Sequence, residues 1–369
     1  MELIIGGQTI ELESLGDSID DKFTKLHAAY LGRDTFNWKK FVEAAHDFFD
    51  DHPDPAWDMH DKYFTNFTVI WRSYLNARDY DRAEEIWRRA MSTALTWESD
   101  HPENRIHKGT PYYFWGVTAL QKGDLDKGYA LMHQAVDEDS KSQGKAFPDT
   151  PAFAFASLNY AEPEQAFREW PYRQMRYMDS RQNNYSARYS RQFHLEHFKD
   201  HFLLSPPSVD IGFLFAYSVA RLMQLSDLPD HALASGFAAQ LEANILFDLA
   251  LVIDGTIKSK NPTKWKFIHH AEFLLAQFNE FLTEDQLREI NQAFNNDFDA
   301  ALSDILDGQL AITGISSLSL AQADVALAYG MRNRGAHDVT AAPTVWTRFS
   351  EIEQALFNVL YLAVDILYP

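Results

Sequence analysis

Apolar residues recur at spacings of three and four along most of the chain, which is the pattern of amphipathic helices. In the N-terminal half this pattern predicts helices over residues 18–32, 38–49 and 56–76. In the C-terminal half it predicts helices over residues 209–226, 230–257, 263–281, 283–306, 317–334 and 343–367. The first twelve residues differ, because two short runs containing β-branched residues flank Gly6 and Gly7 and predict a small β-hairpin. The expected fold class is therefore all-α, with one hairpin at the N-terminus.

An internal repeat lies in the N-terminal half, where residues 78–91 align without gaps on residues 123–136. Both segments begin with a polar turn, place an apolar residue between two aspartates, and end with Ala before a large apolar residue. The pattern resembles the second helix of a tetratricopeptide (TPR) repeat, although the offset of 45 residues exceeds the roughly 34 residues of that family. The resemblance implies TPR-like architecture over residues 60–140. The alternative is a pair of ordinary helical hairpins without a peptide-binding groove.

The strongest break in the pattern is Ser205-Pro206-Pro207-Ser208. Adjacent prolines interrupt helices and mark connections between elements. We therefore expect a helical-repeat region over residues 1–205 and a helical bundle over residues 206–369.

Composition narrows the class of protein. The chain of 369 residues is 46% hydrophobic and contains no cysteine, so disulfides, thiolate metal sites and cysteine nucleophiles are excluded. No apolar run is long enough to cross a bilayer, and the N-terminus lacks the basic and apolar regions of a secretory signal. These features predict a soluble, cytoplasmic protein with no membrane contact.

The chain is strongly acidic, with 33 Lys and Arg against 53 Asp and Glu and a formal net charge of −20. Such a surface repels nucleic acids at long range. Any nucleic-acid site must therefore be a local exception. One basic segment, residues 168–199, carries seven Lys or Arg against three Asp or Glu, with aromatic residues between them.

Two interpretations of this basic segment remain open. Arginines beside aromatic residues can grip phosphates and stack on bases, which would form an RNA surface. The same arginines could instead pair with the acidic remainder of the chain. The candidate RNA-binding residues are Arg173, Arg176, Arg181, Arg188 and Arg191, together with Arg334.

The most specific pattern is Arg332 and Asn333 followed by three residues and His337, between two predicted helices. This arrangement resembles the motif of the HEPN family, and the resemblance spans residues 208–369. It implies a HEPN-like helical bundle, catalytic roles for Arg332, Asn333 and His337, and a homodimer in which two motifs meet. Some members carry a Tyr two residues after the His, but Val339 occupies that place here, so regulation by modification of that Tyr is not expected.

Local geometry favours a site at these residues. Val325, Ala328 and Arg332 are separated by three and four positions, so Arg332 continues the apolar stripe of its helix and would face a cleft or a partner. Gly335 is a natural helix stop that would let the chain turn and bring His337 back towards Arg332.

These residue types suit metal-independent cleavage of RNA, in which the ribose 2′-hydroxyl attacks the adjacent phosphate. Histidine can transfer a proton near neutral pH, and arginine offers a planar cation to the phosphate oxygens. Asn333 would orient the phosphate or the histidine. The expected function is an endoribonuclease without a cofactor, with RNA as substrate and a toxin, anti-phage or stress role typical of relatives. The TPR-like region would regulate it or recruit a protein or peptide.

Two other functions are compatible with the sequence. The chain could be a catalytically inactive adaptor that binds a protein partner. It could also be a metal-dependent hydrolase that uses His194, His197 and His201, with His269 and His270 as further ligands. Three histidines along one helix cannot all reach one ion, however, and no zincin motif is present. No metal is therefore assigned. Phosphate-binding Gly-rich loops and a nucleophile elbow are also missing from the sequence.

Overall fold

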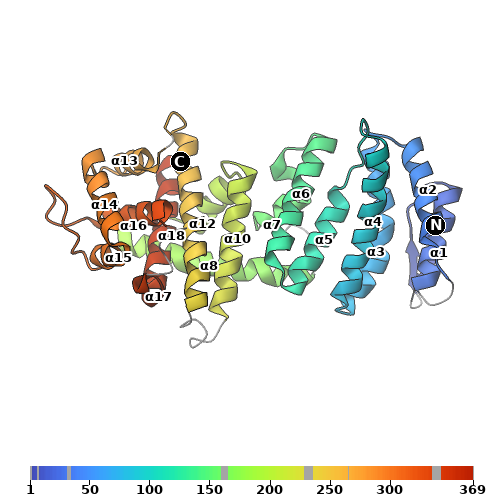
Figure 1. Ribbon diagram of the computed structural model, residues 1–369, viewed down its shortest axis with the longest axis horizontal. Helices are drawn as coiled ribbons and strands as arrows, with labels where there is room; N and C mark the ends of the chain where they lie inside the picture. Colours follow the sequence, from blue (N-terminus) through green and yellow to red (C-terminus); the bar gives the residue numbers. More distant parts are fainter. Residues whose placement is uncertain are drawn as a thin grey trace. The chain divides into compact units, whose positions relative to one another are not determined.

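The computed structural model describes residues 2–5, 8–30, 35–158, 165–227, 236–264, 266–334 and 342–368. These residues form an all-α fold with one small hairpin (Figure 1), which confirms the expected fold class. They divide into two compact units, Met1–Phe153 and Ala154–Pro369. Within the described residues, no helix combines the length and apolarity needed to cross a bilayer.

The first unit begins with the predicted hairpin, in which β1 (Glu2–Ile5) pairs antiparallel with β2 (Gln8–Glu11). Three antiparallel helix pairs follow. They are formed by α1 (Asp17–Tyr30), α2 (Trp38–Asp51), α3 (Trp57–Asn76), α4 (Tyr80–Asp100), α5 (Gly109–Lys122) and α6 (Leu125–Gln143). A short 3₁₀ turn (Phe147–Asp149) leads to α7 (Pro151–Ala156), which contains the division between the units.

Hydrogen bonds join successive helix pairs of the first unit. Four hydrogen bonds join residues 47 positions apart, namely His46–Thr93, Asp50–Trp97, His60–His107 and Trp71–Thr118. Two of these bonds link α2 to α4. The other two link α3 to α5 and to the segment just before it. Other bonds between the pairs have different separations, 49 positions for Asp61–Thr110 and 43 for Glu84–Lys127. Successive pairs therefore pack on one another in a similar but not identical register, as neighbouring units of repeat proteins do.

The two segments of the internal repeat have the same local structure. Asp79 caps α4 by accepting a hydrogen bond from the backbone of Arg82, and Asp124 caps α6 by accepting one from the backbone of Lys127. A capping aspartate satisfies a backbone N–H that the first helical turn leaves unpaired. The sequence repeat therefore marks equivalent helix starts, while membership of the TPR family stays a prediction.

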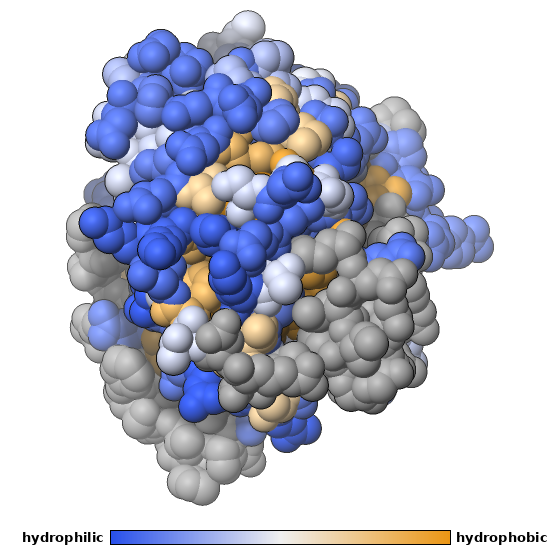
Figure 2. Space-filling model, turned by 90° about the vertical axis from the view of Figure 1, so that its right-hand side faces the viewer, coloured by the Kyte–Doolittle hydropathy of each residue, from blue (hydrophilic) through white to orange (hydrophobic). Residues whose placement is uncertain are grey.

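The end of the first unit that carries α1 and α2 is mostly polar. On α2, Phe41, Phe48 and Phe49 are buried. Figure 2 views the end of the molecule that carries α1 and α2, and hydrophilic residues cover most of the coloured surface with small apolar patches between them. The three-four spacing of apolar residues thus turns the large side chains of α2 inward, as the sequence predicts.

The second unit is a helical bundle. Its helices are α8 (Gln165–Tyr189), α9 (Leu195–Phe198) with a π-helical turn (Lys199–Leu203), α10 (Val209–Ser226), α12 (Gly236–Lys260), α13 (Phe267–Gln277), α14 (Glu284–Asn296), α15 (Phe298–Leu306), α16 (Leu320–Arg334), α17 (Pro343–Thr347) and α18 (Phe349–Leu367). Helix α18 is central, since it contacts α8, α12 and α16 and every residue from Ala355 to Val364 is buried.

Two helices predicted as single segments are divided in the structure. The segment 283–306 breaks at Asp297, whose extended backbone ends α14 and whose side chain caps α15 by accepting from the backbone of Ala300. The segment 343–367 breaks at Arg348 between α17 and α18. Both parts of each segment have helical periodicity, so periodicity alone does not reveal a change of axis between them.

The division between the units differs from the boundary expected at residue 205. Helix α8 precedes Pro206 and Pro207 but packs against α18 and α10, so it belongs to the second unit. The proline pair therefore marks a connection within this bundle, between the π-helical turn and α10.

Candidate functional site

Helix α16 positions Arg332 and Asn333 near its C-terminal end. The helix starts at Ser319, whose side chain accepts from the backbone N–H of Gln322 while the Gln322 side chain accepts from the backbone of Ser319. This reciprocal capping fixes the start of the helix. Its residues from 325 to 331 are buried, and Arg332 follows with 36% of its side chain exposed. Arg332 therefore lies where the buried part of the helix ends and solvent-accessible surface begins.

The Arg332 guanidinium is held by a buried carboxylate. Arg332 Nε donates to Asp254 Oδ2 at 3.1 Å, and Asp254 lies on α12, 78 positions earlier in the chain. His270 on α13 contacts the other oxygen, with 2.6 Å between His270 Nδ1 and Asp254 Oδ1. Burial alone would raise the pKa of Asp254, but the hydrogen bonds from His270 and Arg332 outweigh it and lower this pKa below its ordinary value.

Arg332 and Asn333 open onto a pocket of about 530 Å³ within the second unit. The pocket is lined by Lys266, Phe267, Ile268, Glu284, Arg288, Tyr329, Arg332 and Asn333. Three of these side chains are cationic and one is acidic. Asp254 behind Arg332 adds a second carboxylate, so a small positive excess remains. In a chain with a net charge of −20, such an excess is the local exception that an anion site requires.

The pocket has an apolar floor and a polar rim. Phe267 and Tyr329 are nearly buried, and their rings stack with centroids 5.8 Å apart. Burial raises the pKa of Tyr329 above its usual value, so its hydroxyl stays protonated. On the rim, Arg288 donates to Glu284 at 2.6 Å. An ion pair this exposed is weak and can rearrange when an anion binds.

Asn333 lies on the exposed side of the same helix end. Its Nδ2 donates to Asn291 Oδ1 on α14 at 3.2 Å. This contact ties the end of α16 to α14, and Asn333 itself lines the pocket beside Arg332. Two of the three predicted catalytic residues thus line one pocket. The third, His337, lies outside the described residues, as does the side chain of Arg334.

Sequence reasoning missed Asp254 as part of this site and considered His270 only as a metal ligand. The available signal was a charged residue inside an apolar helix, since Val252 and Ile253 precede Asp254 and are buried. A carboxylate in such surroundings needs a partner. Its partners lie on two other helices, which the sequence does not identify.

The candidate RNA-binding arginines of α8 mostly contact carboxylates of the same unit. Arg181 donates to Glu353 at 2.6 Å, Arg188 to Asp324 at 2.7 Å, and Arg191 to Asp365 at 2.5 Å. These contacts agree with the second interpretation of the basic segment, in which its arginines pair with the acidic remainder of the chain.

The other two candidates on α8 are more exposed. Arg173 pairs with Asp227, with 46% and 59% of the two side chains exposed. Arg176 lies over the ring of Tyr172, with 5.8 Å between the guanidinium carbon and the ring centroid. Neither residue lines the pocket at Arg332.

The histidines considered as metal ligands do not form a recognisable metal centre. The rings of His197 and His201 lie 4.3 Å apart between centroids, and His194 is exposed on the preceding turn. Among the residues that the structure describes, no group of three or more His, Asp or Glu side chains could hold a metal ion.

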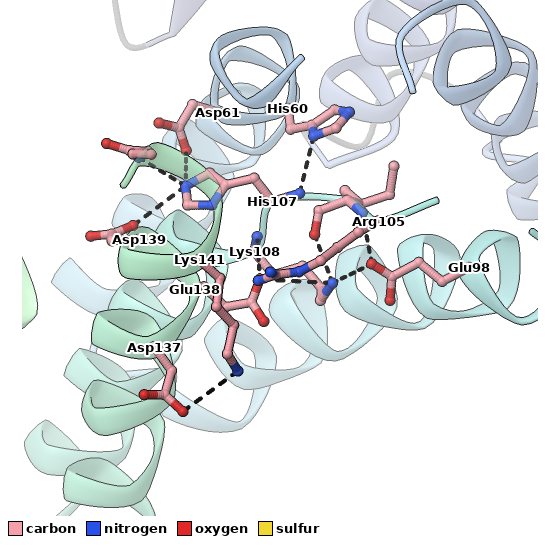
Figure 3. Close-up of polar contacts among 12 residues, drawn as sticks. His60, Asp61, Glu98, Arg105, His107, Lys108, Asp137, Glu138, Asp139 and Lys141 are labelled. Atoms are coloured by element: carbon pink, nitrogen blue, oxygen red, sulfur yellow. Dashed lines mark hydrogen bonds and ion pairs between the residues drawn. The ribbon is translucent and has the colours of Figure 1, made fainter. Parts of the chain in front are cut away.

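A second polar cluster lies inside the first unit, where the segment before α5 passes α3, α4 and α6 (Figure 3). The backbone N–H of His107 donates to His60 Nδ1 at 3.0 Å, and His60 Nε2 contacts the carbonyl of His52 at 2.7 Å. A ring that accepts at Nδ1 and donates at Nε2 is neutral. Burial lowers the pKa of His60 to about 4, which agrees with that neutral ring.

Charged side chains in this cluster satisfy one another. Lys108 contacts Glu98 and donates to the carbonyl of Ile106 at 2.7 Å, while Arg105 donates to Glu138 at 2.6 Å. Each of these partners comes from a different helix or from the segment joining them (Figure 3). The cluster therefore ties the second helix pair to the third.

His107 completes the cluster with two carboxylates. Its Nε2 lies 3.3 Å from Asp61 and 3.4 Å from Asp139. Burial raises the pKa of Asp139 to about 6, although the nearby His107 charge opposes the shift. These residues are spread over residues 61–139 and carry no recognisable motif, so nothing in the sequence pattern marks them.

Comparisons with known proteins do not assign the chain to a family. No family model, curated protein or solved structure matches it. The likeness of Arg332, Asn333 and His337 to the HEPN motif therefore stays a prediction from sequence. The functional argument rests on the pocket that Arg332 and Asn333 line.

Proposed function

We propose that the chain is a metal-independent endoribonuclease of HEPN type, with its phosphate site in the pocket at the end of α16. The observation that carries the proposal is the position of Arg332, held by Asp254 at 3.1 Å and lining a pocket with Lys266 and Arg288. Clustered cations at a partly enclosed site bind phosphate oxygens more strongly than the same groups in open water.

The chemistry assigns a separate task to each group. Arg332 binds the non-bridging phosphate oxygens and stabilises the charge that develops as the ribose 2′-hydroxyl attacks. Asn333 donates a further hydrogen bond from the rim. His337, by resemblance to the family motif, transfers the proton. The products are a 2′,3′-cyclic phosphate and a 5′-hydroxyl, and two copies of the chain form the active dimer.

The helix pairs of the first unit supply regulation or recruitment in this proposal. Their stacked arrangement, in which four hydrogen bonds between successive pairs join residues 47 positions apart, supports a repeat scaffold of the kind that binds protein segments. A toxin, anti-phage or stress role in the cytoplasm belongs to the same proposal.

The first prediction concerns cleavage itself. Purified protein should cut fluorescein-labelled single-stranded RNA in the presence of EDTA and leave cyclic phosphate ends. Arg332→Ala should lower the rate by about 100- to 1,000-fold, as loss of a donor to a developing oxyanion does. His337→Ala should lower it by about 100- to 10,000-fold. The rate is measured by denaturing gel electrophoresis, with Arg88→Ala, an exposed arginine on α4, as the matched control.

Other results would support other functions. Cleavage that EDTA abolishes would point to a metal-dependent hydrolase. A stable dimer that cuts no RNA under any condition would point to a catalytically inactive adaptor. Cleavage that persists in Arg332→Ala would place the active site elsewhere in the chain.

A further inference from the structure

Asp254 connects Arg332 to a fully buried histidine. Its two carboxylate oxygens are used by different partners, Arg332 Nε at 3.1 Å and His270 Nδ1 at 2.6 Å. His270 has no exposed surface, and Asp254 is 9% exposed. The three residues come from α16, α12 and α13, so the contact fixes three helices at the wall of the pocket.

The histidine itself is held on its other side. His270 Nε2 lies 3.2 Å from the backbone carbonyl of Lys264, in the segment between α12 and α13. With both ring nitrogens engaged, the imidazole cannot rotate, and Asp254 in turn cannot turn away from Arg332. A carboxylate placed this way is oriented before any ligand arrives.

This contact determines which donors Arg332 can offer. A guanidinium has five N–H groups in one plane, and Asp254 takes the one on Nε. Within the part of the chain that the structure describes, the terminal nitrogens of Arg332 have no other hydrogen-bond partner, so they are the donors left for the pocket. Such a fork matches the oxygens of a phosphate in two-point geometry.

We propose that Asp254 and His270 are positioning residues that hold Arg332 in the orientation required to bind the reacting phosphate. The inference rests on the proposed function, because it assigns a purpose to the guanidinium of Arg332. It adds two residues to the site that the sequence motif does not contain. Neither touches the substrate, and both act through Arg332.

The test compares full-length Asp254→Asn and His270→Gln with the wild-type protein. Asp254→Asn keeps the shape but removes the charge that holds Arg332. We expect kcat for the fluorescein-labelled RNA to fall about 10- to 100-fold, with KM changed less than about twofold, because the orientation matters most in the transition state. Asp248→Asn is the matched control, since Asp248 also lies on α12 and pairs with Arg221 at 3.2 Å away from the pocket.

A second measurement follows the chemical reactivity of the Arg332 side chain and does not depend on activity. Phenylglyoxal modifies arginines, and peptide mass spectrometry gives the rate at each one. The rate at Arg332 should rise several-fold in Asp254→Asn and His270→Gln and stay unchanged in Asp248→Asn. Thermal unfolding followed by circular dichroism checks that all variants are folded.

The outcomes separate this inference from the proposed function. If the wild-type protein does not cut RNA, the proposed function fails, while the phenylglyoxal rates still decide whether Asp254 and His270 hold Arg332. An unchanged rate at Arg332 in both variants would overturn the positioning role. The positioning role would also be overturned if kcat fell no more in these variants than in Asp248→Asn, provided that the variants show the same drop in melting temperature.

Discussion

Three groups, each made of an arginine, a tyrosine and a carboxylate, link α8 to the helices that it contacts. Tyr189 and Arg188 both donate to Asp324, at 2.6 and 2.7 Å, and only 1% of the Asp324 side chain is exposed. Burial raises the pKa of Asp324, and the charge of Arg188 opposes that shift. Glu353 with Tyr177 and Arg181, and Asp365 with Tyr185 and Arg191, repeat the arrangement.

The second prediction follows from the Asp324 group. Arg188→Ala removes the positive charge that balances the buried carboxylate of Asp324. The free energy of unfolding should therefore fall by roughly 3 kcal/mol at pH 8. The loss should be smaller at pH 5, because protonation of Asp324 then removes the uncompensated charge. Urea unfolding followed by circular dichroism measures both values.

Arg173→Ala provides the comparison for this prediction. Its pair with Asp227 is exposed on both sides, so the loss should be below about 1 kcal/mol. Equal losses in the two variants would mean that the buried group at Asp324 contributes no more than a surface ion pair.

At the residue scale, sequence reasoning could identify groups of neighbours but not distant partners. Arg332 and Asn333 adjoin one another on one helix end, so a single periodicity argument predicts that they lie together. Asp254 is 78 positions from Arg332, and its role depends on how α12 and α16 pack. Both interpretations of the arginines on α8 fitted the charge pattern, and only the positions of the carboxylates in space distinguish them.

Close approach between α14 and α16 depends on one glycine. A Cβ atom added at Gly330 would lie 2.2 Å from Cζ of Phe294, and the other near atoms belong to the same ring. Phe294 is 1% exposed, so the ring has little room to move. Gly330 precedes Arg332 by only two positions. The close contact of Gly330 with Phe294 therefore helps to fix the position of Arg332 at the pocket.

The third prediction concerns this contact. Gly330→Ala should lower the free energy of unfolding by about 1–3 kcal/mol, because an added methyl group in a packed core forces neighbouring side chains to shift. It should also lower RNA cleavage, since α16 carries Arg332. Urea unfolding and the fluorescein-RNA assay measure the two effects.

Gly255→Ala is the control for the glycine prediction. Its added Cβ would meet only the end of the Ile211 side chain, which can rotate, and alanine favours a helix over glycine by up to about 1 kcal/mol. We expect little net change in stability. A Gly330→Ala protein as stable as the wild type would show that α14 and α16 are not closely fitted at this point.

At the element scale, the sequence predicted most helices and the hairpin because their signals are local. Periodicity, capping aspartates such as Asp79 and Asp124, and paired glycines act within a few residues. The breaks at Asp297 and Arg348 were missed because the apolar spacing continues on both sides. A capping aspartate inside a helical pattern was the only local sign of the first break.

At the scale of the whole chain, the boundary was harder to predict than the elements. The Pro206-Pro207 pair is the most prominent interruption in the sequence, but the structure divides at residues 153 and 154. Proline reports the local backbone and not which core a helix joins. Helix α8 joins the second unit through Tyr, Arg and carboxylate contacts that are distant in sequence.

Buried titrating groups should make the first unit sensitive to acid. His27 and His60 are buried in the first unit, and burial lowers the pKa of each to about 4. In the unfolded chain a histidine has a pKa of about 6.5. Between pH 6.5 and pH 4 the unfolded state therefore binds more protons than the folded state, and stability falls as the pH falls. Each histidine can contribute up to about 3 kcal/mol to this loss.

Asp139 acts in the opposite direction. Its pKa is raised to about 6 by burial, so between roughly pH 4 and pH 6 the folded state holds a proton that the unfolded state has released. Acidification through this range is favourable at Asp139 and offsets part of the loss at the histidines. Because two histidines oppose one aspartate, the sum of these three groups still destabilises the first unit on acidification.

The last prediction tests this balance. Urea unfolding followed by tryptophan fluorescence should report mainly the first unit, which holds six of the nine tryptophans, among them the buried Trp71, Trp87 and Trp97. Its free energy of unfolding should be lower at pH 4.5 than at pH 7.5, and His27→Leu should reduce that difference by about 2–3 kcal/mol because one buried titrating group is removed. His194→Gln, at an exposed site of the second unit, should leave the difference unchanged. Since general acid effects act equally on both variants, an unchanged pH dependence in His27→Leu would show that burial of His27 does not make the first unit sensitive to acid.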